Sequence, residues 1–493
     1  MLTTRRAGLA AAVCGAAVLT MLTVGDAAAE SLPDAIALAY GTNPTLQAER
    51  AQLRVIDEEY AQARAGLAPS VNATYTIDRD YNQQIASLGG PPLDANNASI
   101  TITQPLYTGG RVTSAISAAD ADILAGREAL RSTEIGVLQS VIQAYLDVRR
   151  DQEQLAITQD NNAVLNRQLE ETKARFDVGE VTRTDVAQAQ ARLAIADSQR
   201  ASALSTLAIA RAAYAAVVGQ NPGELAPEPP ISKLLPATVD QAFDAAERDN
   251  PQIRQADYAE QASAARVAQA KAATRPTIGA QATLGYAGGG VNSVTGKLNP
   301  FGDYSRDITI AAQVSVPLFS GGLTSSNVRQ AAERDNVTRI GIETARRQVL
   351  QAVSQSWNQL LGARANLLSN EEQVKAQTIA FEGVRQEAQV GLRTTLDVLN
   401  AQQELESAEL SLVGARHDEY LASAAVLAAM GQLEARNLVP DTPRYDPKAN
   451  YEHVRHSLGW TPWEPAAQAI DRLGAPSVSV RPPASPVGEV VRP

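Results

Sequence analysis

Two ten-residue segments hold the residue types in this chain that are best suited to chemistry. DVGEVTRTDV spans residues 177–186, and QVGLRTTLDV spans residues 389–398. Each begins near a Val-Gly pair and ends in Asp-Val, with arginine and threonine between. A carboxylate attracts cations, and a nearby arginine or hydroxyl group can hold it by a charge-assisted hydrogen bond. The chemistry open to these residue types is the pairing and attraction of charge.

Both segments also have a local structural interpretation. Gly179 and Gly391 can adopt the left-handed conformation that ends a helix. Thr184 or a neighbour can cap the helix that follows. Asp185 or Asp397 would then lie in or near its first turn, where the positive end of the helix dipole favours a carboxylate. Each segment is therefore expected to turn one helix into another.

Residues typical of catalytic and metal sites are sparse. Cys14 is the only cysteine, so disulfide, zinc and thiol chemistry are not expected. His453 and His456 could share a helix face, but the sequence shows no cluster for a third ligand, and we expect no metal and no cofactor. No nucleophile motif or phosphate-binding glycine loop occurs, so no enzymatic activity is expected. The net charge of −11 and the lack of a dense Lys/Arg block exclude nucleic acid as a partner.

The N-terminus has the pattern of an export signal. Arg5 and Arg6 precede the apolar run AGLAAAVCGAAVLTMLTVG, which is followed by small residues. We expect residues 1–29 to be a signal peptide that is cleaved after Ala29, in preference to a retained membrane anchor. The mature chain would then contain no cysteine.

The mature chain is a duplication. Asn43-Pro44 recurs as Asn250-Pro251, and QPLYTGG from Gln104 recurs as VPLFSGG from Val316. The two Val-Gly segments follow in the same order. A fixed order of motifs that occurs twice indicates two copies of one structural unit.

The repeats and the proline content set the expected boundaries. Residues 30–225 form the first repeat and residues 237–438 the second. Residues 226–236 form a Pro-rich linker between them. Residues 439–493 form a Pro-rich periplasmic tail, which we expect to be mostly disordered.

Each repeat predicts the same elements. A helical period covers residues 33–65 in the first repeat and 239–273 in the second. Alternating runs then predict a β-hairpin in each, made from SVNATYTI and ASITITQPLY and from TIGAQATLGY and DITIAAQVSVPLF. After each hairpin the helical period returns for about 110 residues, broken only at the Val-Gly segment. The strand-to-helix corners are marked by six residues: Pro105, Gly109, Gly110, Pro317, Gly321 and Gly322.

Four strands cannot close into a barrel. In a bilayer, an open sheet edge leaves backbone groups without partners, so this chain could span a membrane only by pooling strands with copies of itself. Three copies would supply twelve strands, an even number that suits an outer-membrane barrel. Alternation alone is equally compatible with two soluble hairpins packed on the helices. The export signal and the duplicated hairpin-plus-helix plan favour the barrel.

The order of these motifs resembles the TolC type of trimeric outer-membrane efflux and secretion channel. The resemblance runs from LPDAIALAYGTNPTLQAER, beginning at Leu32, to about residue 438. It is carried most specifically by the two corner motifs and the two Val-Gly segments. It implies a mainly α-helical homotrimer without enzymatic activity, with a twelve-stranded β-barrel in outer-membrane lipid and a twelve-helix tunnel in the periplasm. The partners that it implies are a periplasmic adaptor protein and an inner-membrane pump, either an ABC transporter or a proton-driven one.

The resemblance also implies roles for single residues. It places Thr184, Asp185 and Arg393 in a periplasmic latch and Asp397 in a ring of carboxylates that attracts cations. Adaptor docking is expected at the helix tips, at Val178, Gly179, Val390 and Gly391. Two positions depart from the family pattern. Asn400 stands where a second acidic ring is expected, and Ala388 stands where a gate tyrosine is expected.

Two functions remain open from the sequence. The first is the exit duct of a tripartite efflux or type I protein secretion system, in the outer membrane of a Gram-negative bacterium with a long periplasmic portion. The alternative is a periplasmic coiled-coil scaffold without a pore, because long helices alone do not distinguish the two.

Overall fold

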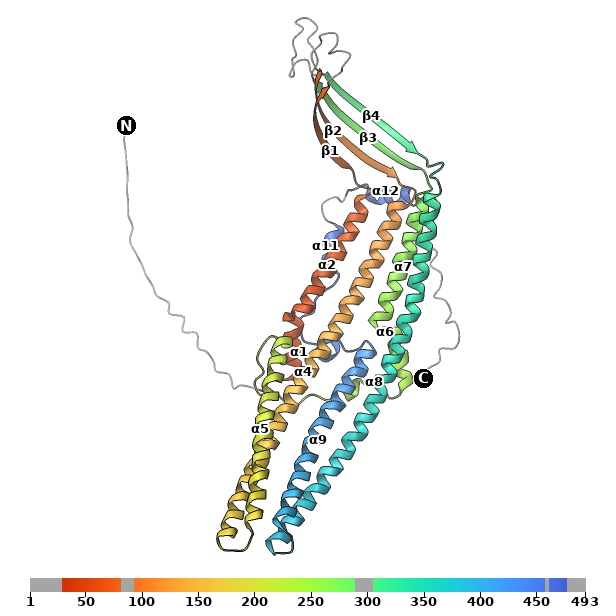
Figure 1. Cartoon of the computed structure of the whole chain (residues 1–493). Helices are drawn as coiled ribbons and strands as arrows, with labels where there is room; N and C mark the ends of the chain where they lie inside the picture. The colour runs from red at the N-terminus through yellow and green to blue at the C-terminus, as the bar shows by residue number, and fades with distance from the viewer. Residues whose placement is uncertain (1–28, 81–92, 289–304, 457–460, 477–493) are drawn as a thin grey trace, which may run out of the picture.

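The computed structural model of the chain describes residues 29–80, 93–288, 305–456 and 461–476. These residues form a long molecule with a β-sheet at one end and two helical tips at the other (Figure 1). Residues 1–28, which make up nearly all of the predicted signal peptide, lie outside the described residues.

The sheet confirms both predicted hairpins and joins them. Strand β1 (Ser70–Asp80) pairs with β2 (Leu93–Tyr107), and β3 (Thr277–Gly288) pairs with β4 (Ser305–Ser315). An antiparallel pairing of β2 with β3 gives one four-stranded sheet in the order β1-β2-β3-β4. Among the described residues, β1 and β4 are therefore edge strands with a neighbour on one side only.

The strand register divides the sheet into an apolar and a polar face. Cross-strand partners share a face, and one row of partners reads Val71, Ile102, Ala282 and Ile310. A row on the other face reads Asn72, Thr101, Thr283 and Thr309. Ile310 is 81% exposed. An exposed apolar face opposite a polar face is the pattern of a strand set with lipid on one side and an aqueous lumen on the other.

Four long helices carry the chain away from the sheet. Helix α4 (Arg111–Asp177) and helix α8 (Leu323–Gln389) each have 67 residues, which at about 1.5 Å per residue span about 100 Å. Helix α5 (Arg183–Val218) returns beside α4, and α9 (Thr395–Ala429) returns beside α8. By length and composition alone α5 could also cross a membrane, which is weak evidence. Figure 1 shows α5 at the end of the molecule away from the sheet.

The predicted helices at 33–65 and 239–273 are each two helices, so these two predictions were wrong in one respect. The first consists of α1 (Leu32–Thr42) and α2 (Pro44–Ala65), and the second of α6 (Val239–Asp249) and α7 (Pro251–Ala272). A proline disfavours the helical conformation of the residue before it, so the chain breaks at the asparagine of each Asn-Pro pair.

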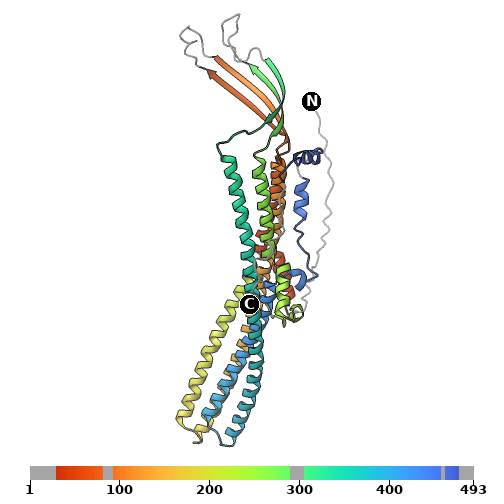
Figure 2. The same cartoon turned by 90° about the vertical axis from the view of Figure 1, so that its right-hand side faces the viewer.

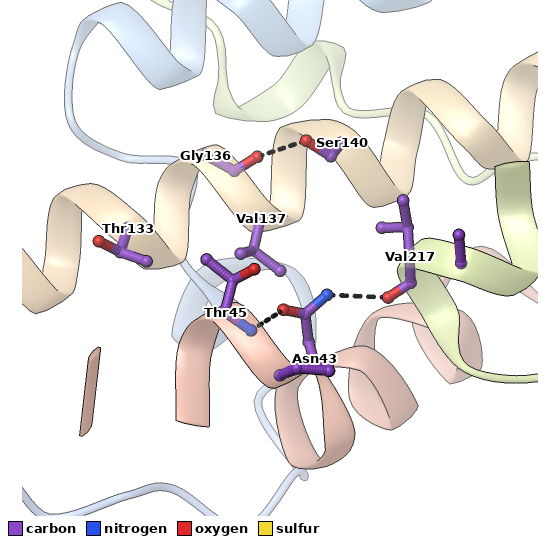
Figure 3. Close-up of a pocket in the computed structure, with 9 residues that line it drawn as sticks. Asn43, Thr45, Thr133, Gly136, Val137, Ser140 and Val217 are labelled. Atoms are coloured by element: carbon purple, nitrogen blue, oxygen red, sulfur yellow. Dashed lines mark hydrogen bonds between the residues drawn. The ribbon is translucent and has the colours of Figure 1, made fainter. Parts of the chain in front are cut away.

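Each of these asparagines joins two helices end to end. Asn43 accepts a hydrogen bond from the N–H of Thr45 at 3.0 Å, which caps α2, and its Nδ2 donates to the carbonyl of Val217 in α5 at 2.9 Å (Figure 3). Asn250 repeats the arrangement, with Nδ2 donating to the carbonyl of Ala429 at 2.8 Å. The duplicated Asn-Pro pairs therefore stack α2 on α5 and α7 on α9.

These stacks give each chain four helical rods in one layer. Near the sheet, α4 lies between α2 and α7, and α7 packs on α8. Near the tips, α4 lies between α5 and α9, and α9 packs on α8. The largest buried cluster lies where the two halves meet, and it contains Ile36, Tyr145, Tyr214, Leu427 and Leu433.

Short elements lie at the C-terminus and at the waist, which is the level where Asn43 and Asn250 join the stacked helices. They are the 3-10 helix η1 (Ser232–Leu234), α10 (Ala435–Leu438), α11 (Ala449–Arg455) and α12 (Glu464–Asp471). Figure 2 shows α11 and α12 along one side of the helical layer, with α12 beneath the sheet. The prediction of a mostly disordered tail is wrong for residues 439–456 and 461–476. Its apolar and charged side chains pack on α2 and α4, where Tyr451 meets Tyr60 edge to face with ring centroids 5.4 Å apart.

Asp471 fixes this tail to the first strand-to-helix corner. Its side chain is fully buried, and Oδ1 accepts from the N–H and the hydroxyl of Thr108 at 2.6 and 2.8 Å. Oδ2 accepts from the N–H and the hydroxyl of Thr113 at 3.3 and 3.2 Å. Gly110, the N-cap residue of α4, donates a further N–H at 3.4 Å. A carboxylate from the end of the chain thus neutralises the positive end of a 67-residue helix.

We predict that Asp471→Ala destabilises this corner. Loss of the acceptor leaves buried N–H groups unpaired, at a cost of about 2 kcal/mol or more. In limited proteolysis of the purified protein, cleavage in the tail should become faster, with Asp441→Ala as a control because Asp441 is exposed. Unchanged cleavage of Asp471→Ala would show that the tail is held elsewhere.

Candidate gate at the helix tips

The two tips turn by the same backbone motif, at the glycines that the sequence predicted. Gly179 has a φ of 82°. Its N–H donates to the carbonyl of Phe176 at 2.9 Å, and the N–H of Glu180 donates to the carbonyl of Arg175 at 2.9 Å. Gly391, with a φ of 83°, ends α8 with the same pair of bonds. Any side chain with a Cβ would strain this left-handed position, so both tips require glycine.

Both returning helices begin with a capping box. Thr182 is the N-cap residue of α5, and its N–H and hydroxyl donate to Oδ2 of Asp185 at 2.8 and 2.7 Å. Thr394 and Asp397 repeat this in α9, with distances of 3.0 and 2.8 Å. The cap is therefore the neighbour Thr182 and not Thr184, which lies exposed inside the first turn of α5.

The capping bonds hold both carboxylates in the charged form. Hydrogen bonds from the side chain and backbone of Thr182 lower the pKa of Asp185. The backbone and side chain of Thr394 lower the pKa of Asp397 in the same way, and Arg393 adds a smaller electrostatic contribution. Each tip thus presents a fixed negative charge near its end.

The tips differ in their ion pairs. Arg393 pairs with Glu387 of its own tip at 2.8 Å, and Arg175 pairs with Glu180 in the other tip at 3.1 Å. Arg393 and Asp185, two of the predicted latch residues, thus have partners within their own hairpins in this single chain. Repetition of the turn did not require repetition of these ion pairs, because the turn is made by the glycine, the threonine cap and the capping aspartate that both tips share.

The tips also expose large apolar side chains. Val178 and Val390 are each 72% exposed, and Leu392 is 76% exposed. Exposed aliphatic groups beside a surface turn are typical of a contact site for another protein.

One helix pair is α4 with α5 and the other is α8 with α9. Contacts between these pairs lie on the sheet side of the tips, and they were not predicted from the sequence. Arg192 of α5 donates through Nη2 to Oδ1 of Asn400 in α9 at 2.9 Å, and through Nη1 to Oε1 of Gln403. Gln402 donates to Asn161 of α4 at 3.1 Å. We name the contacts made by these five residues the polar seam. Arg192 is the only basic residue between Arg183 and Arg200, and this isolated charge was the one sequence feature that could have indicated the polar seam.

A small apolar cluster packs three helices together beside the polar seam. Leu165 of α4, Ala196 of α5 and Leu399 of α9 form a buried cluster of their own. The two leucines and Ala196 thus join α4, α5 and α9 at this level.

A second contact between the pairs is centred on His417 of α9. Nε2 lies 2.9 Å from Oδ1 of Asp147 in α4, and Nδ1 lies 2.9 Å from Oδ1 of Asp418. Burial alone would lower the pKa of His417, and hydrogen bonds to Asp147 and Asp418 outweigh it, so the pKa is raised. The hydrogen bond from His417 lowers the pKa of Asp147 in turn.

The corner residues lie where strand gives way to helix, with one difference between repeats. Gly110 and Gly322 are N-cap residues with a φ of 85° each, and Gly109 and Gly321 before them also have positive φ. Pro105 lies inside β2 next to a bulge, whereas Pro317 follows the end of β4.

A surface cavity at the waist lacks the groups that catalysis needs. It has a volume of about 450 Å³ and lies between the start of α2 and helices α4 and α5 (Figure 3). Its lining is small or uncharged: Asn43, Pro44, Thr45, Thr133, Gly136, Val137, Ser140, Ala216 and Val217. Among the described residues that line it, none has a titratable side chain for general acid–base chemistry.

Comparison with known proteins matches both repeats to one family. The family described as Outer membrane efflux protein covers residues 35–220 and 242–432. The chain belongs to this family. The outer membrane efflux protein BepC of Brucella suis is 34% identical over 439 residues, which cover 88% of this chain and 93% of BepC. The outer membrane protein TolC of Vibrio cholerae is 27% identical, over 83% of this chain and 93% of TolC.

Solved structures agree on the fold. The CmeC outer membrane channel of Campylobacter jejuni superposes with a TM-score of 0.71 at 15% identity, over 86% of this chain and 89% of CmeC. The predicted TolC-type fold is thus confirmed.

Membership in the outer membrane efflux protein family decides between the two functions that the sequence left open. The protein is an outer-membrane channel with a long periplasmic helical portion, and it serves as the exit duct of efflux or type I secretion systems. Members of this family work as channels and not as enzymes. The alternative of a scaffold without a pore is not supported.

We predict that the His417 contact stabilises the protein in acid and weakens as the pH rises. Because the folded-state pKa of His417 is raised above 6.5, its contribution is complete below that value and is lost as the pH passes through the folded-state pKa. His417→Gln should therefore lower the unfolding temperature by more at pH 6 than at pH 9, measured by thermal unfolding at both pH values.

The control is His453→Gln, because His453 is exposed in the tail. Equal destabilisation by His417→Gln at both pH values would mean that protonation of this imidazole does not strengthen the contact.

Proposed function

We propose that three copies of this chain close around an axis into one duct, and that the duct is gated by its helix tips. The proposal rests on the edges of the single chain. The sheet ends in strands whose outer backbone groups have no partner among the described residues, and the helical layer ends in helices that expose apolar side chains. A heterologous contact between such edges generates a ring when its rotation closes.

The sheet supplies the first pair of edges. Strands β1 and β4 each have one free side among the described residues, and in a bilayer those backbone groups must be paired. Pairing β4 of one copy with β1 of the next satisfies both. The second corner lies at this edge, and its Leu318 and Phe319 are 92% and 90% exposed.

The helical layer supplies the second pair of edges. Helix α5 exposes Ile195, Leu204 and Ile209, and the last of these is 68% exposed. At the same level, helix α8 on the opposite edge exposes Leu361, Leu368 and Ile379. Packing α5 of one copy on α8 of the next would bury both apolar edges, at about 25 cal/mol for each Å² removed from water.

The gate lies where the two helix pairs of one chain can separate. In the closed state, the polar seam holds α5 and α4 to α9 through Arg192, Asn400 and Asn161. Arg393, Asp185 and Thr184 lie nearer the tips, and we propose that they form the latch when the copies come together. For this, Arg393 must exchange Glu387 for a partner on the other helix pair.

The expected adaptor site is the exposed aliphatic surface at the two tips, with Val178, Val390 and Leu392 as its apolar contacts beside Gly179 and Gly391. The apolar face of the sheet is the expected contact with outer-membrane lipid. The inner-membrane partner of the duct is then an ABC or proton-driven pump.

We predict that Arg192→Ala and Arg393→Ser each raise the resting conductance of the channel. The wild-type protein should give heat-modifiable trimers in outer-membrane fractions and discrete currents in planar bilayers. Removing a bond that holds the closed state should then increase the conductance of single channels about threefold or more, since lost hydrogen bonds of charged groups shift an equilibrium by more than 1 kcal/mol.

Arg200→Ala is the matched control, because Arg200 lies on the same helix and pairs only weakly with Asp197, at 3.9 Å. An effect of Arg192→Ala without one of Arg393→Ser would confine the latch to the polar seam. If neither variant differs from Arg200→Ala, the gate is not held by these arginines. An absence of trimers or currents would contradict the proposal that three copies form one duct.

We propose that Asp397 forms the ring of three carboxylates that faces the passage. Its charge is fixed by Thr394, and carboxylates at close quarters attract cations. Asn400, one turn further along α9, contributes no charge and is bonded to Arg192.

Asp397→Asn is therefore expected to reduce cation preference, measured as a shift of the reversal potential in asymmetric salt. Asp185→Asn is a close control, because Asp185 has the same capping bonds but lies in the other tip. Equal shifts in both variants would point to a general loss of surface charge, and no shift in Asp397→Asn would remove this residue from the filter.

A further inference from the structure

Helix α12 is amphipathic in the opposite sense to an ordinary surface helix. Its inward face carries acidic residues, of which Glu464 is 8% and Asp471 0% exposed. The apolar side chains that face outward are Trp463, the N-cap residue, Ile470 in the last turn, and Leu473, two residues beyond the helix. They are 52%, 48% and 67% exposed. A surface helix in water normally buries its apolar face and exposes its charges.

The inward charges are satisfied within the protein. Asp471 accepts hydrogen bonds from the backbone and hydroxyl groups of Thr108 and Thr113 at the start of α4. Glu464 pairs with the buried Arg64 of α2 at 3.7 Å. The orientation of α12 is thus set by buried polar contacts, and the apolar side chains are left to face outward.

The outward face is regular. Trp463 and Ile470 are seven positions apart, which places them on one side of the helix, and Leu473 follows three positions later in the turn that ends it. Arg472 is exposed among them. An apolar stripe bordered by a cation is the pattern of a helix that lies in the interface of a phospholipid membrane.

The hydrogen bond from Tyr107 fixes the side of the sheet on which α12 lies. The Tyr107 hydroxyl donates to the carbonyl of Leu473 at 3.1 Å. Tyr107 follows the bulge in β2, and its partner in the register is Ile278. Ile278 shares a face with Ala282 and hence with Ile102 and Ile310, the apolar face of the sheet. Helix α12 therefore lies on the lipid side of the strands, at the end where they meet the helices (Figures 1 and 2).

We propose that α12 is a membrane-interface anchor, which inserts Trp463, Ile470 and Leu473 into the phospholipid headgroup region of the inner leaflet of the outer membrane. The occupant of this apolar face is lipid and not a second copy of the chain, because the face continues the lipid-facing surface of the sheet. Tryptophan at the border of a membrane-spanning segment is enriched in this region for the same physical reason, since its ring is apolar and its N–H is polar.

The anchor would link the corner to the membrane. Ala475, just beyond α12, packs so closely on Gly110 that a Cβ at Gly110 would come within 2.6 Å of the Ala475 Cβ. The start of α4 is thereby held at a fixed depth below the strands. The proposal rests on the family's position in the outer membrane and does not depend on the gate.

The test is depth-dependent quenching of tryptophan fluorescence in the full-length protein. The chain has three tryptophans, and Trp357→Phe with Trp460→Phe leaves Trp463 as the only one. The trimer is reconstituted into phosphatidylethanolamine and phosphatidylglycerol vesicles that contain phosphatidylcholine brominated either near the carbonyl groups or deep in the acyl chains. Shallow bromines should reduce Trp463 emission about twofold, and deep bromines less, because an interfacial indole lies at headgroup depth.

Two reporters in a background without native tryptophan calibrate the depth. Ile310→Trp, on the apolar face of the sheet and 81% exposed, should be quenched by bromines in the membrane. Phe176→Trp, 42% exposed at the end of α4 beside the first tip, should not be quenched by either lipid. Quenching at residue 310 shows that the strands are inserted, so a failure of the anchor can be told from a failure of the barrel.

Two results would overturn the proposal. Quenching of Trp463 by aqueous iodide and not by bromolipid would place α12 in water, and protection from both would place it against another protein surface, such as a second copy. A variant with Ile470→Asn and Leu473→Asn provides the converse test. It should lose most of the bromolipid quenching at Trp463 while the Ile310→Trp reporter, placed in the same variant, is unaffected.

Discussion

The unpaired edges of a four-stranded sheet are the constraint on which this structure depends. Water can satisfy the free N–H and C=O groups of β1 and β4, but hydrocarbon cannot. A chain that places an exposed apolar face on this sheet therefore cannot exist in the membrane as a single copy. The helical layer must also be closed by neighbouring copies, because α5 and α8 lie at its edges near the tips and expose apolar residues of their own.

The helical layer keeps four continuous rods along its whole length with few specific interactions. Two helices of 67 residues run its whole length, and the other two rods are each made from a short helix stacked on a long one. Asn43 and Asn250 make the stacking possible, because one side chain caps the upper helix and also satisfies a terminal carbonyl of the lower one. The rods remain continuous where the backbone is broken, which preserves four rods per chain at both levels.

The two repeats share the same backbone geometry at their tips but differ in their ion pairs. Both tips have a left-handed glycine, a threonine cap and a capping aspartate, since these determine whether the chain can turn. The ion pairs beside them differ, and so do the corners, where Asp471 occupies the first and leaves the second without such a partner among the described residues.

The sequence by itself determined the local elements of this protein. Hydrophobic period, proline and glycine define the hairpins, the corners and the turns at Gly179 and Gly391, because those signals act within a few residues. Even there, the break at each Asn-Pro pair was missed. The cap of α5 was left open between Thr184 and a neighbour, since nearby hydroxyl groups compete for the same backbone donor. The tertiary structure alone decided that Arg192 reaches Asn400, that His417 reaches Asp147, and that a Pro-rich tail folds back so that Asp471 meets Thr108. These partners are more than 200 residues apart in the sequence. Their pairing depends on the packing of whole helices, which leaves no periodic trace along the chain.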